Sequence, residues 1–284
     1  KDLKNMIPKI IHYCWFGGNP LPQEFKDYIE GWKQMYPDFK IIQWDESNFD
    51  VDNVIFTKEA YSVKKYAFVA DYVRMWALHQ YGGLYMDTDI KVIKRINEDW
   101  LNNDRFLAAM EYHEDNARIL NYKDRLTPEG YKKDPKDILK YICLESSIFA
   151  AEANHPFIND CLSYYKDRHF VLSDGSYYDK IIVPVIMAIE ADKYGLRYVN
   201  EFQELKEGMH IIPCEYFTNP HLQTPNTLVL HMAKNSWVNL TFKQKIYQTL
   251  QHNKVILGVY RWLESFSLTK RFFDYVQKKT WLEN

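Results

Sequence analysis

The first part of the chain alternates between short apolar runs and amphipathic stretches. Residues 9–16 (KIIHYCWF) are β-branched and aromatic, and the turn sequence GGNP at residues 17–20 follows them, which predicts a strand and a turn. Residues 22–35 repeat apolar side chains at helical spacing, and residues 39–46 return to a strand pattern. This β-α-β opening predicts an α/β fold whose sheet is partly parallel.

A second helix and strand follow the opening. Residues 66–81 have helical spacing and end at Gly82-Gly83, a sequence typical of a helix C-terminus. Residues 84–93 (LYMDTDIKVI) predict a strand that two acidic residues interrupt. Residues 97–140 are polar and punctuated by proline and glycine, so we expect an irregular, mobile segment there, suited to an acceptor loop.

The rest of the chain continues the alternation of strands and helices. Residues 143–152 and 227–233 (TLVLHMA) have strand patterns, and an apolar helix is expected around residues 181–190. From residue 240 onward the sequence is helical, basic and aromatic. We therefore predict a Rossmann-like mixed sheet flanked by helices over residues 1–239, with a helical C-terminal extension over residues 240–284 packed on it.

Composition narrows the possible functions. The chain has 284 residues, of which 46% are hydrophobic and 26% charged, so it can build a substantial core. A net charge of −2 argues against a nucleic-acid partner. The four cysteines show no CxxC spacing, and the first residues, KDLKNMIPK, lack the apolar core of a signal peptide. We therefore expect a cytoplasmic protein without a zinc site or a disulfide framework.

Asp87 and Asp89 are the sharpest chemical signal. The apolar residues 84–86 precede them, so a strand would deliver two carboxylates to its end. Such oxygen ligands bind Mg²⁺ or Mn²⁺ and leave coordination positions for water and phosphate. A bare Asp-x-Asp motif is common, however, and its neighbours must decide its meaning.

The helix before this motif carries two charges in an apolar setting. Asp71 and Arg74 are the only Asp, Glu, Lys or Arg residues between Lys65 and Asp87. At about 100° per residue they share a helix face with small side chains such as Ala67, where burying a charge is costly unless a polar group meets it. Two interpretations follow: an internal ion pair, or two residues that line a sugar and phosphate pocket.

Together these segments resemble a known family. IHYCWFGG, AFVADYVRMWALHQYGGLYMDTDI and HMAKNSW are similar to glycosyltransferase family 32 and its capsular-polysaccharide relatives, and to the glucosylating domain of large clostridial toxins. The core of the resemblance covers residues 7–92. It implies a GT-A fold, a nucleotide-sugar donor with UDP as the expected nucleotide, a divalent metal and retention at the anomeric carbon.

The resemblance also implies roles for individual residues near the motif. Trp15 would stack on the donor base, although a strand-end aromatic in the core is the alternative. Asp71 and Arg74 would hold the sugar and the diphosphate, and Tyr85 would contact the donor. Asp89 would be the direct metal ligand, while Asp87 would divide its contacts between the metal and the donor, with Thr88 beside it.

The C-terminal match implies further donor contacts. His231 follows a predicted strand and is a candidate third metal ligand, although single histidines are often structural. Ser236 and Trp237 would meet the diphosphate, and Lys234 would add a positive charge or remain solvated.

Two departures from the family concern the reacting centre. Glu145-Ser146 stands where relatives often place Asn, and Ile-Val-Pro around Pro184 replaces Thr-Gly-Pro, which leaves the sugar and the acceptor open. We take Asp71, Arg74, Asp87 and Glu145 as candidate catalytic residues. Front-face attack by the acceptor is the expected mechanism, and a double displacement through Glu145 is the alternative.

The basic C-terminal segment has two interpretations. Residues 234–284 contain nine Lys and Arg against three Asp and Glu, interspersed with Trp and Phe. Within it, residues 255–281 could form an amphipathic helix that packs its aromatic side chains on the body, or the last turns could contact the anionic inner face of the plasma membrane. A lipid-linked glycan acceptor would make the second arrangement useful.

The function expected from the whole sequence is transfer of a hexose or N-acetylhexosamine from a UDP-sugar to a glycan or lipid-linked acceptor in bacterial surface polysaccharide assembly. A toxin-like protein glycosyltransferase is one alternative. A haloacid-dehalogenase-like phosphohydrolase also begins with an apolar strand and Asp-x-Asp, but that motif normally lies near the start of the chain. A non-catalytic sugar-nucleotide binder is the last alternative.

Overall fold

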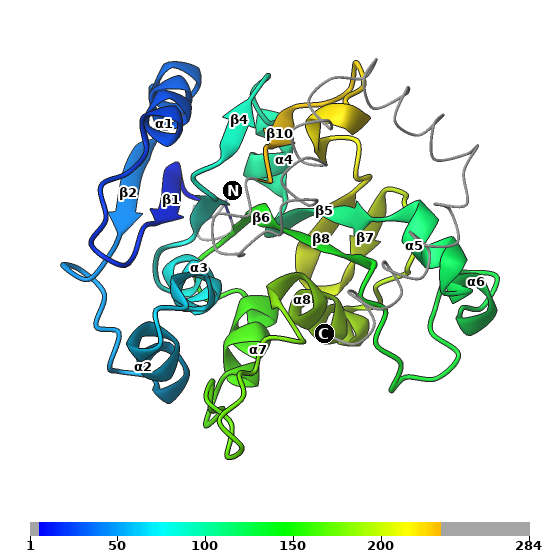
Figure 1. Cartoon of the computed structure of the whole chain (residues 1–284). Helices are drawn as coiled ribbons and strands as arrows, with labels where there is room; N and C mark the ends of the chain where they lie inside the picture. Colours follow the sequence, from blue (N-terminus) through cyan, green and yellow to red (C-terminus); the bar gives the residue numbers. More distant parts are fainter. Residues whose placement is uncertain (1–5, 234–284) are drawn as a thin grey trace, which may run out of the picture.

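The computed structural model describes residues 6–233 and places two sheets in this part of the chain (Figure 1). The larger sheet has seven strands, in the spatial order β2 (Lys40–Trp44), β1 (Ile10–Cys14), β3 (Gly83–Met86), β6 (Ile142–Ala151), β5 (Phe106–Tyr112), β8 (Met209–Ile212) and β7 (Gln203–Leu205). The smaller sheet has three, in the order β4 (Ile90–Val92), β10 (Val229–His231) and β9 (Phe217–Thr218).

Helices lie on both faces of the larger sheet (Figure 1). One face is covered by α3 (Tyr66–Tyr81), α7 (Pro156–Tyr164) and α8 (Val183–Ala191), with α2 (Ile55–Ser62) packed on α3. The other face carries α1 (Gln23–Met35), α4 (Glu98–Asn103) and the smaller sheet. The short helices α5 (Glu114–Ile119) and α6 (Tyr122–Arg125) lie at one end, and short 3₁₀ helices cover Asp192–Tyr194, Lys206–Gly208 and Pro220–Leu222.

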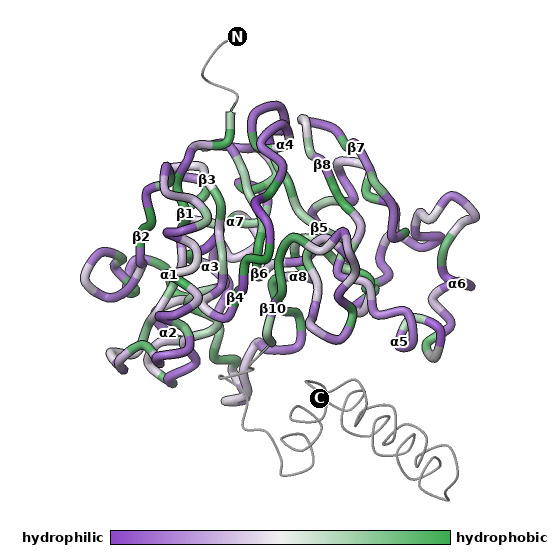
Figure 2. Tube along the Cα trace, turned by 90° about the horizontal axis from the view of Figure 1, so that it is seen from above, coloured by the Kyte–Doolittle hydropathy of each residue, from purple (hydrophilic) through white to green (hydrophobic). Residues whose placement is uncertain are grey.

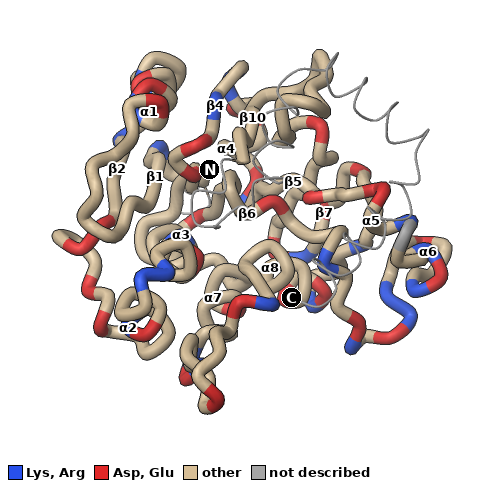
Figure 3. The backbone as a smooth tube through the Cα atoms, viewed as in Figure 1, with Lys and Arg blue, Asp and Glu red and all other residues tan. Residues whose placement is uncertain are grey.

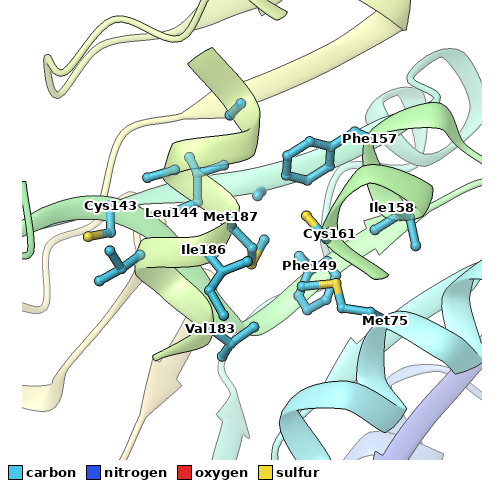
Figure 4. Packing of buried hydrophobic residues seen from close by; sticks show 14 of the residues in the cluster. Met75, Cys143, Leu144, Phe149, Phe157, Ile158, Cys161, Val183, Ile186 and Met187 are labelled. Atoms are coloured by element: carbon cyan, nitrogen blue, oxygen red, sulfur yellow. The ribbon is translucent and has the colours of Figure 1, made fainter. Parts of the chain in front are cut away.

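The alternation of side chains along the strands divides the core into two layers. In β5, Phe106 and Ala108 pack among α7 and α8, whereas Leu107 and Ala109 pack toward the smaller sheet. Figure 4 shows the first layer, in which Phe149 of β6 meets apolar side chains of α3, α7 and α8. Burying one such large side chain stabilises the fold by about 1.5–3 kcal/mol. Seen from above, hydrophobic residues run along β6 and β10 (Figure 2).

Strand direction gathers several strand ends at one edge of the sheet. β1 is parallel to β2 and β3, and β5 is parallel to β8. β6 is antiparallel to its neighbours β3 and β5, so its first half lies at the edge where those two strands end. Ligand sites of α/β proteins form at this carboxyl edge. The residues that follow β1, β3 and β5 are therefore brought toward the beginning of β6.

The structure confirms the predicted mixed α/β sheet flanked by helices. The helix predicted over residues 66–81 is confirmed with the same bounds as α3. Gly82 at its C-terminus has a φ of 62°, a conformation that favours glycine. The parallel β-α-β opening is also confirmed. Residues 84–93 were expected to form one strand, which is wrong: β3 and β4 belong to different sheets, and the Asp87–Asp89 turn passes from one to the other.

The expectation of an irregular segment over residues 97–140 is also wrong. This stretch contains α4, the buried strand β5, α5 and α6. Its polar composition comes from the outer helices, where acidic and basic residues alternate along α5, α6 and the chain that follows (Figure 3). Within residues 6–233, the helices are too short or too polar to cross a bilayer. The boundary at residue 239 and the extension over residues 240–284 lie outside the described residues.

Candidate metal centre

Hydrogen bonds hold the backbone of the Asp87–Asp89 turn in place. The amide of Asp87 donates to the carbonyl of Ser147 in β6 at 2.7 Å, and the amide of Ile90 donates back to the carbonyl of Asp87 at 3.1 Å. The indole N–H of Trp32, a fully buried residue of α1, donates to the Ile90 carbonyl at 2.9 Å. The two carboxylates therefore project from a turn whose backbone is fixed by the neighbouring elements.

His231 reaches this turn from the other end of the sequence. β10 pairs antiparallel with β4, and the register places His231 opposite Ile90. The amide of Met232 donates to the carbonyl of Asp89 at 3.1 Å. The imidazole Nε2 of His231 then lies 3.6 Å from Oδ1 of Asp89. A strand more than a hundred residues further along the chain thus supplies a third polar group.

The three side chains fit a divalent cation. One ligand atom from each of Asp87, Asp89 and His231 can be chosen so that all lie within 4.8 Å of one another. Ions with bonds of about 2.0–2.6 Å place opposite ligands roughly 4–5 Å apart, which matches this spacing. Two carboxylates and an imidazole suit Mn²⁺ or Mg²⁺, and the half-buried positions leave access for further ligands. The structure thus brings the three predicted ligands together, and their role as metal ligands stays a prediction.

Arg74 connects α3 to the first of these carboxylates. Its guanidinium lies 2.9 Å from Asp71 Oδ1 and 3.5 Å from each carboxylate oxygen of Asp87, and it donates to the Ser146 carbonyl at 2.7 Å. The Arg74 and Asp71 side chains are only 6% and 12% exposed. The pair is thus the internal ion pair of one sequence interpretation, and the same arginine also reaches the candidate metal centre.

Burial and charge act against each other in this cluster. Burial raises the pKa of Asp71 to about 6, and nearby Asp87 adds to the rise, while Arg74 opposes it. Burial by itself would lower the pKa of Arg74, but Asp87, Tyr85 and Asp71 together raise that pKa above its ordinary value. The arginine is therefore permanently charged, and its positive charge lies beside Asp87.

Tyr85 orients Asp87 from within the sheet. It is 1% exposed, and its hydroxyl donates to Asp87 Oδ1 at 2.7 Å. The Arg74 guanidinium carbon lies 4.8 Å from the centre of its ring, a cation–π contact. Burial raises the pKa of Tyr85 well above its ordinary value, so the hydroxyl remains a donor. Tyr85, which the sequence predicts to contact the donor, thus touches the candidate metal centre by its hydrogen bond to Asp87.

Trp15 and Thr88 lie on the same edge of the sheet as the carboxylates. Trp15 follows β1, which is parallel to β3, and its indole N–H donates to the Asn19 carbonyl at 2.6 Å. The edge of its ring packs on Phe25 at 5.9 Å between ring centres. Both Trp15 and Thr88 are half-buried, so each retains accessible surface at this edge.

Glu145 is buried at the beginning of β6, next to His231. Its Oε1 accepts a hydrogen bond from the Ser147 amide at 2.8 Å and lies 3.9 Å from Nδ1 of His231. Burial raises the pKa of Glu145, whereas His231 opposes this rise. The imidazole therefore has Asp89 on one nitrogen and Glu145 on the other. A carboxylate behind a metal-binding histidine is a common means of orienting the ring.

Comparison with known proteins bears on this geometry. Residues 22–107 match the protein family described as "Glycosyltransferase sugar-binding region containing DXD motif". This part of the chain is similar to DXD-containing glycosyltransferases. The match includes the Asp71–Arg74 pair and both carboxylates of the turn, whereas Glu145 and His231 lie beyond it.

Individual relatives match this chain either at low sequence identity or over only part of its length. Inositol phosphoceramide mannosyltransferase 1 of Schizosaccharomyces pombe is 22% identical over 282 residues, which cover 92% of this chain and 71% of the relative. Inositol phosphoceramide mannosyltransferase 2 of the same yeast is 32% identical over 92 residues, 30% of this chain and 25% of the relative. The crystal structure of mouse xyloside xylosyltransferase 1 has a TM-score of 0.47 and 9% identity over 81% of this chain and 99% of the mouse chain.

Sequence reasoning missed some residues around the centre. Trp32 lies within the helical pattern of residues 22–35, but nothing in that pattern shows that its indole meets the Ile90 carbonyl. Glu111 and His113 were not singled out, although they follow the apolar run of β5 much as Asp87 follows that of β3. Lys234, Ser236 and Trp237 lie outside the described residues, and their expected contacts with the diphosphate stay predictions.

Proposed function

We propose that this protein is a GT-A glycosyltransferase that transfers a sugar from a nucleotide-sugar donor with the help of a divalent metal. The observation that carries the proposal is the convergence of Asp87, Asp89 and His231 beside Arg74 at the carboxyl edge of the sheet. The family match over residues 22–107 supports it, because that region contains both carboxylates.

The residues around the centre have different proposed roles in binding a donor. A divalent cation held by Asp87, Asp89 and His231 would supply positive charge to the leaving diphosphate. Arg74 adds a second, permanent positive charge at the same edge, fixed in place by Asp71 and the Ser146 carbonyl. Tyr85 holds the orientation of Asp87 through its hydroxyl. Trp15 would stack on the nucleotide base.

The position of Glu145 favours an orienting role. Its Oε1 accepts a hydrogen bond from the Ser147 amide and lies 3.9 Å from Nδ1 of His231. A nucleophile would instead need a free oxygen directed at the reacting carbon. We therefore propose front-face attack with retention at the anomeric carbon, in which the acceptor hydroxyl approaches from the side of the departing diphosphate. Double displacement through Glu145 is the alternative that this arrangement disfavours.

The donor, acceptor and setting belong to the same proposal. The resemblance to family 32 supports a UDP-sugar, and the mannosyltransferase names of the yeast relatives add GDP-mannose to the donors worth testing. A glycan or lipid-linked glycan is the proposed acceptor, in bacterial surface polysaccharide assembly. We propose a cytoplasmic location, at the inner face of the plasma membrane if residues 255–281 contact lipid.

The proposal is tested by donor binding and hydrolysis with a panel of UDP- and GDP-sugars. The purified protein is assayed with Mn²⁺, with chelator and as Asp89→Asn, and Mn²⁺ binding is followed separately by electron paramagnetic resonance. Asp99→Asn, an exposed aspartate of α4, is the matched control. We expect one donor to be hydrolysed with Mn²⁺, and about 100-fold or greater loss in Asp89→Asn.

Three outcomes would contradict the proposal. Equal loss in Asp99→Asn and Asp89→Asn would assign the effect to the fold rather than to the centre. Cleavage of a simple phosphate ester without turnover of any nucleotide-sugar would favour a phosphohydrolase. Metal-dependent donor binding without hydrolysis or transfer to any glycan would indicate a sugar-nucleotide binder.

A further inference from the structure

The turn that carries Trp15 leaves the sheet beside the candidate metal centre. The register of β1 and β3 places His12 opposite Tyr85, so Trp15, three residues later, lies level with the Asp87–Asp89 turn. On its other side β1 pairs with β2, and the Trp15 amide donates to the Trp44 carbonyl at 2.9 Å. The residues that follow Trp44 are thus brought against the same turn.

Glu46 holds the backbone of this turn. Its Oε1 accepts a hydrogen bond from the Gly17 amide at 2.5 Å. A hydrogen bond to an ionised carboxylate is roughly twice as strong as one between neutral groups. The hydrogen bond to Glu46 also raises the pKa of Tyr61, and burial and the charge of the carboxylate add to the rise. The exposed Glu46 side chain therefore joins the turn to a tyrosine of α2.

Two aromatic rings close the turn on the side of α3. The Tyr66 ring lies so close to Gly17 that any side-chain carbon at position 17 would overlap it. Gly17 also has a φ of 99°, a left-handed conformation that favours glycine. Tyr66 in turn packs on Tyr61, with 5.3 Å between the ring centres. A larger residue at position 17 would therefore displace the ring or the turn.

The indole of Trp15 is fixed relative to this backbone. Its N–H donates to the Asn19 carbonyl at 2.6 Å, and the edge of its ring packs on Phe25. The next residue, Phe16, is only 6% exposed and packs on Phe49 in the core. An aromatic side chain that is ordered before a flat ligand arrives loses less entropy on binding. The bonds that hold this turn should therefore act on the affinity for a ligand that stacks on the indole.

We propose that Glu46 is a positioning residue of the donor site, which fixes the Trp15 turn so that the indole is presented to the nucleotide base. Tyr61 and Tyr66 hold the other side of the turn. The inference rests on the proposed function and deepens it, because it assigns part of the nucleotide affinity to a carboxylate outside the candidate metal centre. Loss of Glu46 then weakens nucleotide binding and leaves metal binding and turnover of the bound donor unchanged.

The first test measures binding of UDP and GDP to the full chain with Mn²⁺ by calorimetry, and kcat and KM for the donor that is hydrolysed. We expect Glu46→Ala to weaken nucleotide binding about three- to tenfold and to raise KM by a similar factor, with kcat within about twofold of the wild type. In Glu46→Gln the amide oxygen can still accept from the Gly17 amide. This variant should bind the nucleotide within about twofold of the wild type.

Glu30→Ala is the matched control, because Glu30 is an exposed carboxylate of α1 that pairs with Lys33. Equal nucleotide affinity in Glu46→Ala and Glu30→Ala would overturn the proposal. Weaker Mn²⁺ binding by Glu46→Ala in the absence of nucleotide would also overturn it, because the effect would then belong to the metal centre or to the fold.

A second test observes the turn itself. Fluorine NMR of protein labelled with fluorotryptophan separates the indoles of the 8 tryptophans, and Trp15→Phe identifies the Trp15 resonance. We expect Glu46→Ala to shift or broaden this resonance and Glu30→Ala to leave it as in the wild type. An unchanged Trp15 resonance in Glu46→Ala would overturn the positioning role even if nucleotide affinity fell.

The two proposals fail in different ways. If the wild-type protein binds neither UDP nor GDP with Mn²⁺, the proposed function fails and the role of Glu46 in the donor site fails with it. If the wild type binds a nucleotide and hydrolyses a donor, but Glu46→Ala binds that nucleotide equally well, only the role of Glu46 fails.

Discussion

Two sites on either side of the Asp87–Asp89 turn, one around Arg74 and one around Glu145, hold their buried polar groups differently. In residues 6–93, the buried guanidinium of Arg74 is surrounded by Asp71, Asp87 and the Ser146 carbonyl. In residues 94–233, Glu145 Oε1 accepts from the Ser147 amide and lies 3.9 Å from Nδ1 of His231. The buried Oδ1 of Asn219 has no partner among the residues described.

This difference separates a preorganised site from one that a ligand completes. Charges that are already paired and oriented suit a diphosphate and a metal, because little rearrangement is needed when the reaction develops charge. The unpaired Oδ1 of Asn219 costs about 1–3 kcal/mol until a donor group reaches it. We propose that the first region holds the donor, and that His231 joins it to the second region.

The strongest way to break this comparison is to remove the central charge of the first region. Arg74→Met leaves Asp71 buried without its cation, so we expect the free energy of unfolding to fall by about 3–5 kcal/mol. Urea denaturation followed by circular dichroism measures the change. The double variant Asp71→Leu/Arg74→Met should be more stable than Arg74→Met alone, because it also removes the unpaired carboxylate.

Arg118→Met is the matched control for the arginine. Arg118 pairs with Asp115, but both side chains are 75% exposed, so its loss should cost less than about 1 kcal/mol. If the two arginine variants were equally destabilised, the buried Asp71–Arg74 pair would contribute no more stability than an exposed ion pair.

A buried histidine gives the first region a pH-dependent stability. His12 is fully buried: its Nε2 bonds the Gly82 carbonyl, and its Nδ1 accepts from the Trp44 indole at 3.1 Å. Burial lowers the pKa of His12 from 6.5 to about 4, and nearby Lys40 lowers it further, while the bond to Gly82 opposes the shift.

Between pH 6.5 and 4, His12 is therefore protonated in the unfolded chain but neutral in the folded protein. The associated stability is complete above pH 6.5 and decreases as the pH falls toward 4, by up to about 3 kcal/mol. We expect His12→Gln to flatten this part of a stability–pH profile measured by urea denaturation. An unchanged slope in that variant would assign the pH dependence to other groups.

The link between the two regions is tested at His231. His231→Gln removes the imidazole that faces Asp89, and we expect Mn²⁺ affinity to fall by about 10–100-fold in a titration followed by electron paramagnetic resonance. His210→Gln is the control, because this half-buried histidine of β8 pairs with Asp104 instead. If both variants bind Mn²⁺ like the wild type, the metal is held by the first region alone.

Local sequence patterns determined much of the first region but little of the second. The α3 boundaries follow from helical spacing and the Gly82-Gly83 stop, and Asp87 and Asp89 stand out at the end of an apolar run. β5 was missed because its seven residues lie within a polar stretch containing proline and glycine. The proximity of Glu111, Glu145 and Asn219 depends on strand pairing across more than a hundred residues, which no local pattern encodes.

A substitution at Trp32 is expected to have the smallest effect on stability, and it tests how the Asp87–Asp89 turn is held. Trp32→Phe keeps an aromatic side chain in the core but removes the donor to the Ile90 carbonyl, so we expect a loss of about 1–2 kcal/mol in unfolding free energy. The turn carrying Asp87 and Asp89 also loses one of its three backbone attachments, which should weaken Mn²⁺ binding severalfold. Trp100→Phe, an aromatic residue of α4 with ring contacts to Phe202 and Tyr216, is the control. Weaker Mn²⁺ binding in Trp32→Phe alone would show that α1 positions the carboxylates, whereas equal binding in both variants would mean that the bonds from β6 and β10 suffice.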